Sequence, residues 1–269
     1  MSEAADLDLE AYLARIGHQA PVKPDETTLR ALHEAHVGTI PFENLDVLLK
    51  QPIRLDLASV QAKLVAAGRG GYCFEHGALF AAMLAKIGFP VTTLAARVRM
   101  GSPGLMPRSH MLLKVEIAGR FFLADVGFGG QGLLEPMPME AGAAAAGPGV
   151  RYRLAEEDAQ LVLQGDFGKG WVDFYIFTQE RQYPIDYEVS NHFTATHPSS
   201  RFVQILTAQL TRRHERLILK NRTLHVWRAP GEQRVTAKDD AALLALLKQH
   251  FGLSFPAGTR FPVPEPAQA

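Results

Sequence analysis

The chain has 269 residues, 47% of them hydrophobic, and its 28 basic residues balance its 28 acidic ones. A chain of this length can bury a substantial core and divide into two or three compact units. The even charge argues against a nucleic-acid partner or an anionic membrane surface, and no uncharged apolar stretch is long enough to span a bilayer.

The compartment is predicted from the start of the chain and from the cysteine count. Residues 1–8 are acidic where a secretory signal would be basic, so we expect a cytoplasmic protein. One cysteine, Cys73, allows no internal disulfide, which agrees with a reducing compartment and leaves the thiol free for chemistry. The oligomeric state cannot be predicted from the sequence.

The first third of the chain is expected to be helical. Apolar residues recur at helical spacing over 7–16 and 29–36, which predicts two amphipathic helices. His33 and His36 on the second helix resemble half of a metal site, but no further ligands follow at a useful spacing, so we expect no metal. The segment 41–45 carries two polar residues in an apolar setting, which predicts a capping or core hydrogen-bonding role.

A third helix is expected to begin at the cysteine. Glycines at 68, 70 and 71 precede Cys73, and the apolar run after it predicts a buried helix that ends at Gly88. A thiol at a helix N-terminus faces unpaired amides and the positive end of the helix dipole, which favour the thiolate, and Arg69 would add to this effect. These features indicate a nucleophilic cysteine; a small buried hydrophobic residue is the alternative.

From residue 91 onwards the apolar period changes to two, which is typical of strands. The predicted strands of this middle part are 91–98, 111–117, 121–126, 152–154, 159–163 and 171–177. The stretch 140–149 is expected to be a loop or a weak helix. The last part is predicted to contain strands at 202–210, 216–220 and 223–228, then a helix that is capped at 239–240 and ends at Gly252.

Residues 109–127 are expected to form a β-hairpin that brings a histidine to a carboxylate. If Ile117 faces Arg120 across a two-residue turn, His110 and Asp125 lie on one face as diagonal neighbours, about 7 to 8 Å apart between backbones. A cysteine nucleophile needs a base, and the base needs an orienting group. The hairpin therefore supplies both for a triad with the thiol, and the pairing would also compensate a buried carboxylate. Taken alone, the histidine could equally be an ordinary polar residue at a strand start.

A glycine-rich segment follows the hairpin. Residues 127–132 match the dinucleotide-binding pattern GxGxxG, but two prolines within 133–138 replace the helix that this pattern requires, so we reject that interpretation. What remains is a flexible loop whose exposed amides would cradle an anionic group such as a pyrophosphate. A plain turn-rich connection is the alternative.

Taken together, these residues resemble the arylamine N-acetyltransferase family. The resemblance rests on the segment 69–75 around the cysteine, on His110 and on the segment 125–129. It extends to three segments outside the triad, at 12–17, 40–46 and 196–202, and so covers most of the chain.

The resemblance implies an α+β fold in three parts, with a triad core like that of cysteine proteases. These parts are an N-terminal helical bundle, a central β-barrel and a C-terminal α/β lid, which agrees with the change of periodicity along the chain. We expect the bundle, carrying the nucleophile, at 1–90, the barrel, carrying the histidine and aspartate, at 91–199, and the lid at 200–269.

The resemblance also implies an activity, a ping-pong acetyl transfer with acetyl-CoA as the donor and no metal. Cys73 would accept the acetyl group as a thioester, coenzyme A would leave, and a small aromatic amine or hydrazine would take the group. His110 would be the base, Asp125 would orient it, and the amide of Cys73 with a neighbouring amide would stabilise the oxyanion. Phe128 and Gly129 are the candidate contacts for coenzyme A.

One position departs from the family pattern. Gly77 stands where family members more often carry Asn, which puts a polar contact of this helix in doubt but leaves the triad intact. Other functions stay open on the same residues: an amide synthase, a thiol hydrolase, or a non-catalytic module that binds CoA or an aromatic ligand. The complete set of three side chains argues against the last of these.

Overall fold

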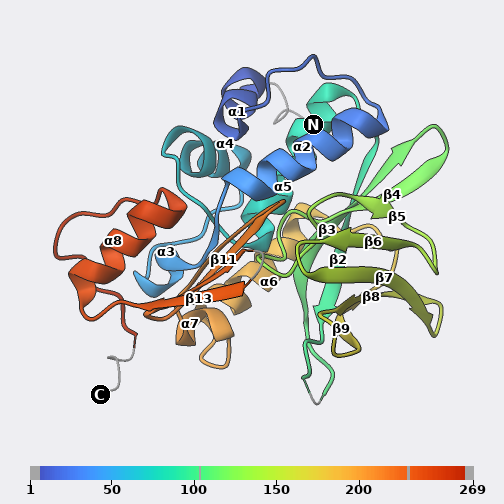
Figure 1. Cartoon of the computed structure of the whole chain (residues 1–269). Helices are drawn as coiled ribbons and strands as arrows, with labels where there is room; N and C mark the ends of the chain where they lie inside the picture. Colours follow the sequence, from blue (N-terminus) through green and yellow to red (C-terminus); the bar gives the residue numbers. More distant parts are fainter. Residues whose placement is uncertain (1–6, 103, 229–230, 264–269) are drawn as a thin grey trace.

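The structure is a computed structural model that describes residues 7–102, 104–228 and 231–263. Its helices and strands form an eight-stranded sheet, a five-stranded sheet and a group of N-terminal helices. In Figure 1 the N-terminal helices lie above the two sheets, and the eight-stranded sheet curls beside them as a nearly closed barrel. The expected α+β fold class is confirmed.

The helices and strands have the following bounds. The helices are α1 (Leu9–Ile16), α2 (Glu26–Thr39), α3 (Leu45–Leu48), α4 (Leu57–Gln61), the π-helical turn η2 (Ala62–Ala66), α5 (Cys73–Ile87), α6 (Pro184–Thr196), α7 (Arg201–Gln204) and α8 (Asp240–Phe251). The strands are β1 (Phe42–Glu43), β2 (Val91–Val98), β3 (Arg108–Ile117), β4 (Arg120–Ala124), β5 (Met137–Pro138), β6 (Ala144–Gly147), β7 (Val150–Glu157), β8 (Gln160–Asp166), β9 (Trp171–Phe177), β10 (Thr207–Arg212), β11 (Glu215–Lys220), β12 (Thr223–Arg228) and β13 (Gly231–Thr236).

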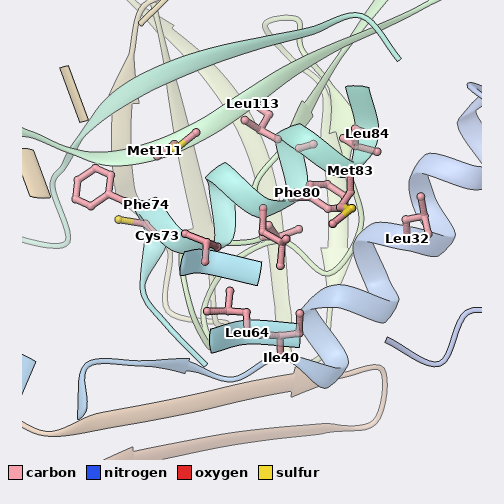
Figure 2. Packing of buried hydrophobic residues seen from close by; sticks show 14 of the residues in the cluster. Leu32, Ile40, Leu64, Cys73, Phe74, Phe80, Met83, Leu84, Met111 and Leu113 are labelled. Atoms are coloured by element: carbon pink, nitrogen blue, oxygen red, sulfur yellow. The ribbon is translucent and has the colours of Figure 1, made fainter. Parts of the chain in front are cut away.

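The three helices expected in the first third of the chain are present as α1, α2 and α5. Aspartates cap two of them, since the side chains of Asp8 and Asp25 accept backbone N–H groups in the first turns of α1 and α2. Helix α5 is the central element of the core, and its apolar residues pack on α2 and on β3 (Figure 2). This packing places the start of α5 between the helices and the barrel.

The barrel-like sheet runs in the order β5-β4-β3-β2-β9-β8-β7-β6, and its two edge strands contact each other. Strands β3 and β4 form the expected hairpin, with Ile117 opposite Arg120. The turn residues Ala118 and Gly119 have φ angles of 50° and 77°, so both adopt the left-handed conformation that a tight two-residue turn requires. The predicted register is therefore confirmed, and it decides which side chains share a face.

The five-stranded sheet joins the N-terminal third of the chain to its C-terminal part. Its order is β1-β10-β11-β12-β13, so the short strand β1 from the N-terminal third pairs with β10 from the C-terminal part. Helix α8 lies beside this sheet (Figure 1), and its Leu243, Leu247 and Phe251 are buried in the sheet's core. The predicted final helix is confirmed, with Asp239 as its cap and Gly252 at its end.

In the second half of the chain some elements were predicted wrongly and others were not predicted. A continuous strand at 202–210 does not form, because Ser200 caps the short helix α7 and the strand begins only at Thr207. Within 140–149 the structure has the edge strand β6. Helix α6 and strand β13 were not predicted. Helix α6 buries Tyr187, Asn191 and Thr194, whereas its apolar Ile185 and Val189 are exposed, and all of β13 is exposed.

The boundaries of the three parts, 1–90 for the bundle, 91–199 for the barrel and 200–269 for the lid, stay a prediction.

Within residues 7–102, 104–228 and 231–263, no helix is both long and apolar enough to cross a membrane.

Candidate active site

Cys73 is the first residue of α5, as the glycines before it predicted. The carboxylate of Glu75 accepts the N–H of Tyr72 at 3.0 Å and so caps the helix at the residue before the thiol. Gly71 pairs with Phe42 in a parallel bridge, and a Cβ atom at Gly70 would lie 2.1 Å from the carbonyl oxygen of Pro41. The strand segment that presents the thiol is thus packed directly against another backbone, which excludes larger residues.

Arg69 is placed differently from what the sequence suggested. Its guanidinium binds the carboxylates of Glu43 at 2.9 Å and Asp46 at 2.8 Å and lies over the ring of Phe255. Its charge is therefore compensated by these two acids rather than directed at Cys73. The expected structural role of the segment 41–45 is confirmed here, because Glu43 also accepts the N–H of Leu45 at 2.6 Å.

His110 and Asp125 meet as the hairpin register predicted. The imidazole Nε2 lies 2.8 Å from the Asp125 carboxylate, and both residues are buried, with 3% and 2% of their surface exposed. Burial lowers the pKa of His110, but the Asp125 charge and hydrogen bond, together with the Cys73 side chain, outweigh it and raise the pKa to about 10. The imidazole is therefore protonated at neutral pH.

The Cys73 side chain lies close enough to this imidazole to contribute to the raised pKa of His110. Its Sγ lies 3.5 Å from the carbonyl oxygen of Ser109, the residue before His110. Because Nε2 is bound to Asp125, Nδ1 is the ring nitrogen left for the sulfur. A Cβ atom at Gly127 would lie 2.8 Å from the Cα of Cys73, so only glycine lets the segment after Asp125 pass this close to the helix start.

Asp125 receives two further hydrogen bonds. The hydroxyl of Tyr175 donates to Oδ2 at 2.8 Å, and the N–H of Gly127 donates to Oδ1 at 3.1 Å. Burial would raise the pKa of this carboxyl, but His110 and these donors lower it. Tyr175 was not predicted as a site residue. Its strand β9 was predicted, but the order of the strands was not: β2 pairs with both β3 and β9 and so brings Tyr175 to the hairpin.

Comparison with known proteins agrees with this geometry. A family described as N-acetyltransferase matches residues 25–259. An arylamine N-acetyltransferase of Mycobacterium tuberculosis (strain ATCC 25618 / H37Rv) is 40% identical over 256 residues, which span 92% of this chain and 90% of the relative. The chain belongs to the arylamine N-acetyltransferase family, a family of acyltransferases.

Solved structures agree with this membership of the arylamine N-acetyltransferase family. The enzyme from Salmonella typhimurium superimposes with a TM-score of 0.88 at 38% identity and covers 91% of this chain and 90% of its own. The Mycobacterium marinum enzyme, solved in complex with CoA, gives 0.86 at 36% identity, covering 91% and 92%. The fold predicted from the family resemblance is therefore confirmed.

In this acetyltransferase the glycine-rich loop packs against His110. The ring of Phe128 contacts the His110 imidazole edge-on, at 5.2 Å between centroids, and stacks on Phe174. Gly129 has a φ of 88°, and the N–H of Gly130 donates to the Gln209 side chain at 2.7 Å. Some of the amides expected to be exposed are thus bound within the chain, and contact of Phe128 and Gly129 with coenzyme A stays a prediction.

The space beside Gly77, the position predicted to depart from the family pattern, is filled by a neighbouring side chain. Gly77 is buried on α5, and a Cβ atom there would lie 2.7 Å from the sulfur of Met111 on β3. The methionine side chain occupies the space that a side chain at position 77 would need (Figure 2 shows Met111 beside α5).

His33 and His36, which resemble a metal half-site, take part in hydrogen bonds instead. His33 contacts the backbone of Asp125 and Leu134, whereas His36 contacts Tyr12 and His76. Among the residues that the structure describes, no group of three or more histidine, cysteine or acidic side chains is arranged to hold a metal ion.

Proposed function

We propose that the enzyme transfers an acetyl group from acetyl-CoA to an arylamine or arylhydrazine through a thioester on Cys73. The observation that carries the proposal is the buried His110 imidazole, with the Asp125 carboxylate on Nε2 and the Cys73 side chain close enough to raise its pKa. The CoA bound to the M. marinum relative supports the donor, and the names of the relatives support an arylamine acceptor.

The first half-reaction acetylates the enzyme. Protonated His110 holds the Cys73 sulfur as a thiolate, which attacks the carbonyl carbon of the acetyl thioester. The amides of Cys73 and a neighbour at the start of α5 are the donors for the oxyanion that forms. When the tetrahedral intermediate collapses, the bond from carbon to the CoA sulfur breaks, and His110 gives its proton to the departing sulfur.

The second half-reaction returns the enzyme to its starting state. Neutral His110 accepts a proton from the amine nitrogen as that nitrogen attacks the acetyl carbon of the Cys73 thioester. The bond from carbon to Cys73 sulfur then breaks, which releases the amide and restores the ion pair of thiolate and imidazolium. Asp125 keeps the imidazole in one orientation and stabilises its charge through both steps. We propose that Phe128 and Gly129 contact coenzyme A beside this centre.

A transfer assay tests the proposal. Purified enzyme is incubated with acetyl-CoA and either aniline or phenylhydrazine, and released CoA and acetylated product are both measured, with Cys73→Ser as the control. We expect equal amounts of CoA and product, with the variant strongly impaired. Release of CoA without acetylated product would instead support a hydrolase, and binding of CoA without release would support a non-catalytic module.

An amide synthase remains the alternative on the same triad, because it would use the same acyl-enzyme. Here the acceptor amine would lie within the acyl chain, so cyclisation of an amino-acyl thioester without external amine is the result that would favour it.

We also propose the cytoplasm as the location, since a reducing compartment keeps the Cys73 thiol free for this chemistry.

A further inference from the structure

Two histidines of α2 touch the catalytic elements but take no part in the proposed reaction. His33 and His36 are completely buried, three residues apart on one face of the helix. The ring of Phe80 from α5 packs edge-on against both imidazoles, with centroids 5.9 and 5.2 Å away. Their orientation is therefore set by packing as well as by hydrogen bonds.

The protonation state of His33 follows from its two partners. The N–H of Asp125 donates to His33 Nε2 at 3.1 Å, so Nε2 carries no proton. Nδ1 lies 3.0 Å from the carbonyl oxygen of Leu134, which can only accept, so Nδ1 carries the proton. His33 is thus a neutral ring that holds the backbone of Asp125 on one side and the loop after it on the other. Burial agrees with this state, because it lowers the pKa of His33 to about 4.

His36 reaches the nucleophile through a second histidine. The Nε2 of His76 lies 3.1 and 3.2 Å from the carbonyl oxygens of Gly71 and Pro41, so it must be the donor to both. Its Nδ1 then accepts from Nε2 of His36 at 2.9 Å, and Nδ1 of His36 accepts from the hydroxyl of Tyr12 at 3.0 Å. The two carbonyl oxygens therefore determine which ring nitrogen of His76, and in turn of His36, carries the proton.

This series of hydrogen bonds ends at the backbone segment that carries the thiol. Gly71 is two residues before Cys73, its N–H donates to the oxygen of Pro41, and its own oxygen accepts from Glu43. His76 binds both carbonyl oxygens of this pairing and so holds the two segments together just before α5 begins.

We propose that α2 sets the distance between nucleophile and base: His33 positions Asp125, and His36, through His76, positions the backbone before Cys73. Both imidazoles belong to one rigid helix, so a shift of either catalytic element relative to the other must break one of these contacts. Displacements of about 1 Å around reacting atoms can cost about a hundredfold in rate. The inference rests on the proposed triad, and it assigns His33, His36 and His76 as positioning residues.

Asparagine and glutamine form a matched pair of variants at both α2 positions. The amide nitrogen or oxygen of Asn falls near the place of Nδ1, whereas that of Gln falls near Nε2. His33→Gln keeps an acceptor for the Asp125 N–H, and His33→Asn keeps only the contact with Leu134. His36→Gln keeps a donor for His76, and His36→Asn keeps only the contact with Tyr12.

The measurements are the rate of Cys73 alkylation by iodoacetamide, the kcat and KM for acetyl-CoA, and the melting temperature. We expect both Asn variants to lose about tenfold in alkylation rate and in kcat, with little change in KM, and the Gln variants to keep most of both rates. Equal losses in the Asn and Gln variants, or losses that simply follow the melting temperature, would overturn the proposal.

A measurement on the unmodified enzyme covers the case in which a variant does not fold. Nitrogen-15 NMR of the imidazoles should find His33 with its proton on Nδ1 and His36 and His76 with theirs on Nε2, none of them titrating near neutral pH. A different tautomer or an ordinary titration for His33 or His36 would contradict the inference. Because alkylation needs no acetyl-CoA, it tests the positioning even if the wild-type enzyme transferred no acetyl group, which would refute only the proposed function.

Discussion

Asp125 is a buried carboxylate that receives hydrogen bonds from His110, Tyr175 and Gly127. Its lowered pKa means that its contribution to stability is present above the ordinary value of 3.8 and is lost as the pH falls through the folded-state value. The pH at which this stability is lost on the acid side therefore reports how well the carboxylate is bound.

Removing the Tyr175 hydroxyl should raise the pKa of Asp125. We expect Tyr175→Phe to move the midpoint of acid unfolding to higher pH, because one donor to the carboxylate is lost while the ring remains. The measurement is the folded fraction as a function of pH, with Tyr187→Phe as a control whose hydroxyl binds a backbone carbonyl instead. An unchanged midpoint in a folded variant would mean that the hydroxyl does not act on Asp125.

His110→Ala should slow alkylation of Cys73 near neutral pH by about tenfold or more. Without the imidazole the thiol has no neighbouring base to take its proton, and the thiolate is the form that iodoacetamide alkylates. His225→Ala is the control, since that histidine lies in the C-terminal sheet and pairs with Glu232. Equal alkylation rates in all three proteins would show that His110 does not activate the thiol.

At this scale the sequence predicted the residues that share one hairpin and missed those that do not. His110 and Asp125 could be paired because one short turn sets their register. Tyr175 reaches the Asp125 carboxylate from β9, and His33 reaches the Asp125 backbone N–H from α2, 50 and 92 residues away in the chain, and no local pattern relates them. His33 was noticed, but its spacing from His36 was considered only as half of a metal site, which was rejected, and no hydrogen bond was predicted for it.

Helix α5 and strand β3 are fitted to each other at Gly77 and Met111. Gly77→Ala would gain about 1 kcal/mol of helix propensity, but its Cβ would overlap the Met111 sulfur, and overpacking costs about 1 to 3 kcal/mol. We expect a net loss of about 1 kcal/mol in the wild type and a gain in a Met111→Ala background. Denaturant unfolding of the four proteins measures the coupling, and additive effects would show that the two positions are independent.

Elements with a strong period were predictable, whereas elements stabilised by tertiary contacts were not. The strand 91–98 and the final helix follow their apolar patterns and were predicted closely. Helix α6 exposes its apolar Ile185 and Val189, and it is held in place instead by Asn191, which accepts a hydrogen bond from the hydroxyl of Tyr72 and donates to the oxygen of Ile53. Such contacts can be identified only when distant segments are seen together.

On the scale of the whole molecule, Asn44 joins the N-terminal third to the C-terminal sheet. Its amide nitrogen donates to the carbonyl oxygens of Phe202 and Ile205, both at 2.7 Å, and its oxygen accepts the N–H of Thr207 at 2.8 Å. The three-part order of the chain was predictable from its changes of period, but this connection was not, since its partners lie about 160 residues away.

Asn44→Ala should therefore destabilise the folded enzyme by about 2 to 4 kcal/mol, because three backbone groups lose their partner in a buried place. Chemical denaturation measures the change. Gln204→Ala, which removes one exposed hydrogen bond to Pro198, is the control and should change the stability by less than about 0.5 kcal/mol. Similar effects of both substitutions would contradict the role of Asn44.

The most direct measurement is the mass of the intact protein after brief mixing with acetyl-CoA in the absence of any amine. If the Cys73 sulfur takes the acetyl group, the wild-type protein gains the mass of one acetyl group, Cys73→Ala gains none, and addition of an arylamine restores the original mass. An unmodified wild-type protein that nevertheless produces acetylated amine, or an acetyl group that persists in Cys73→Ala, would contradict the thioester on which the whole mechanism depends.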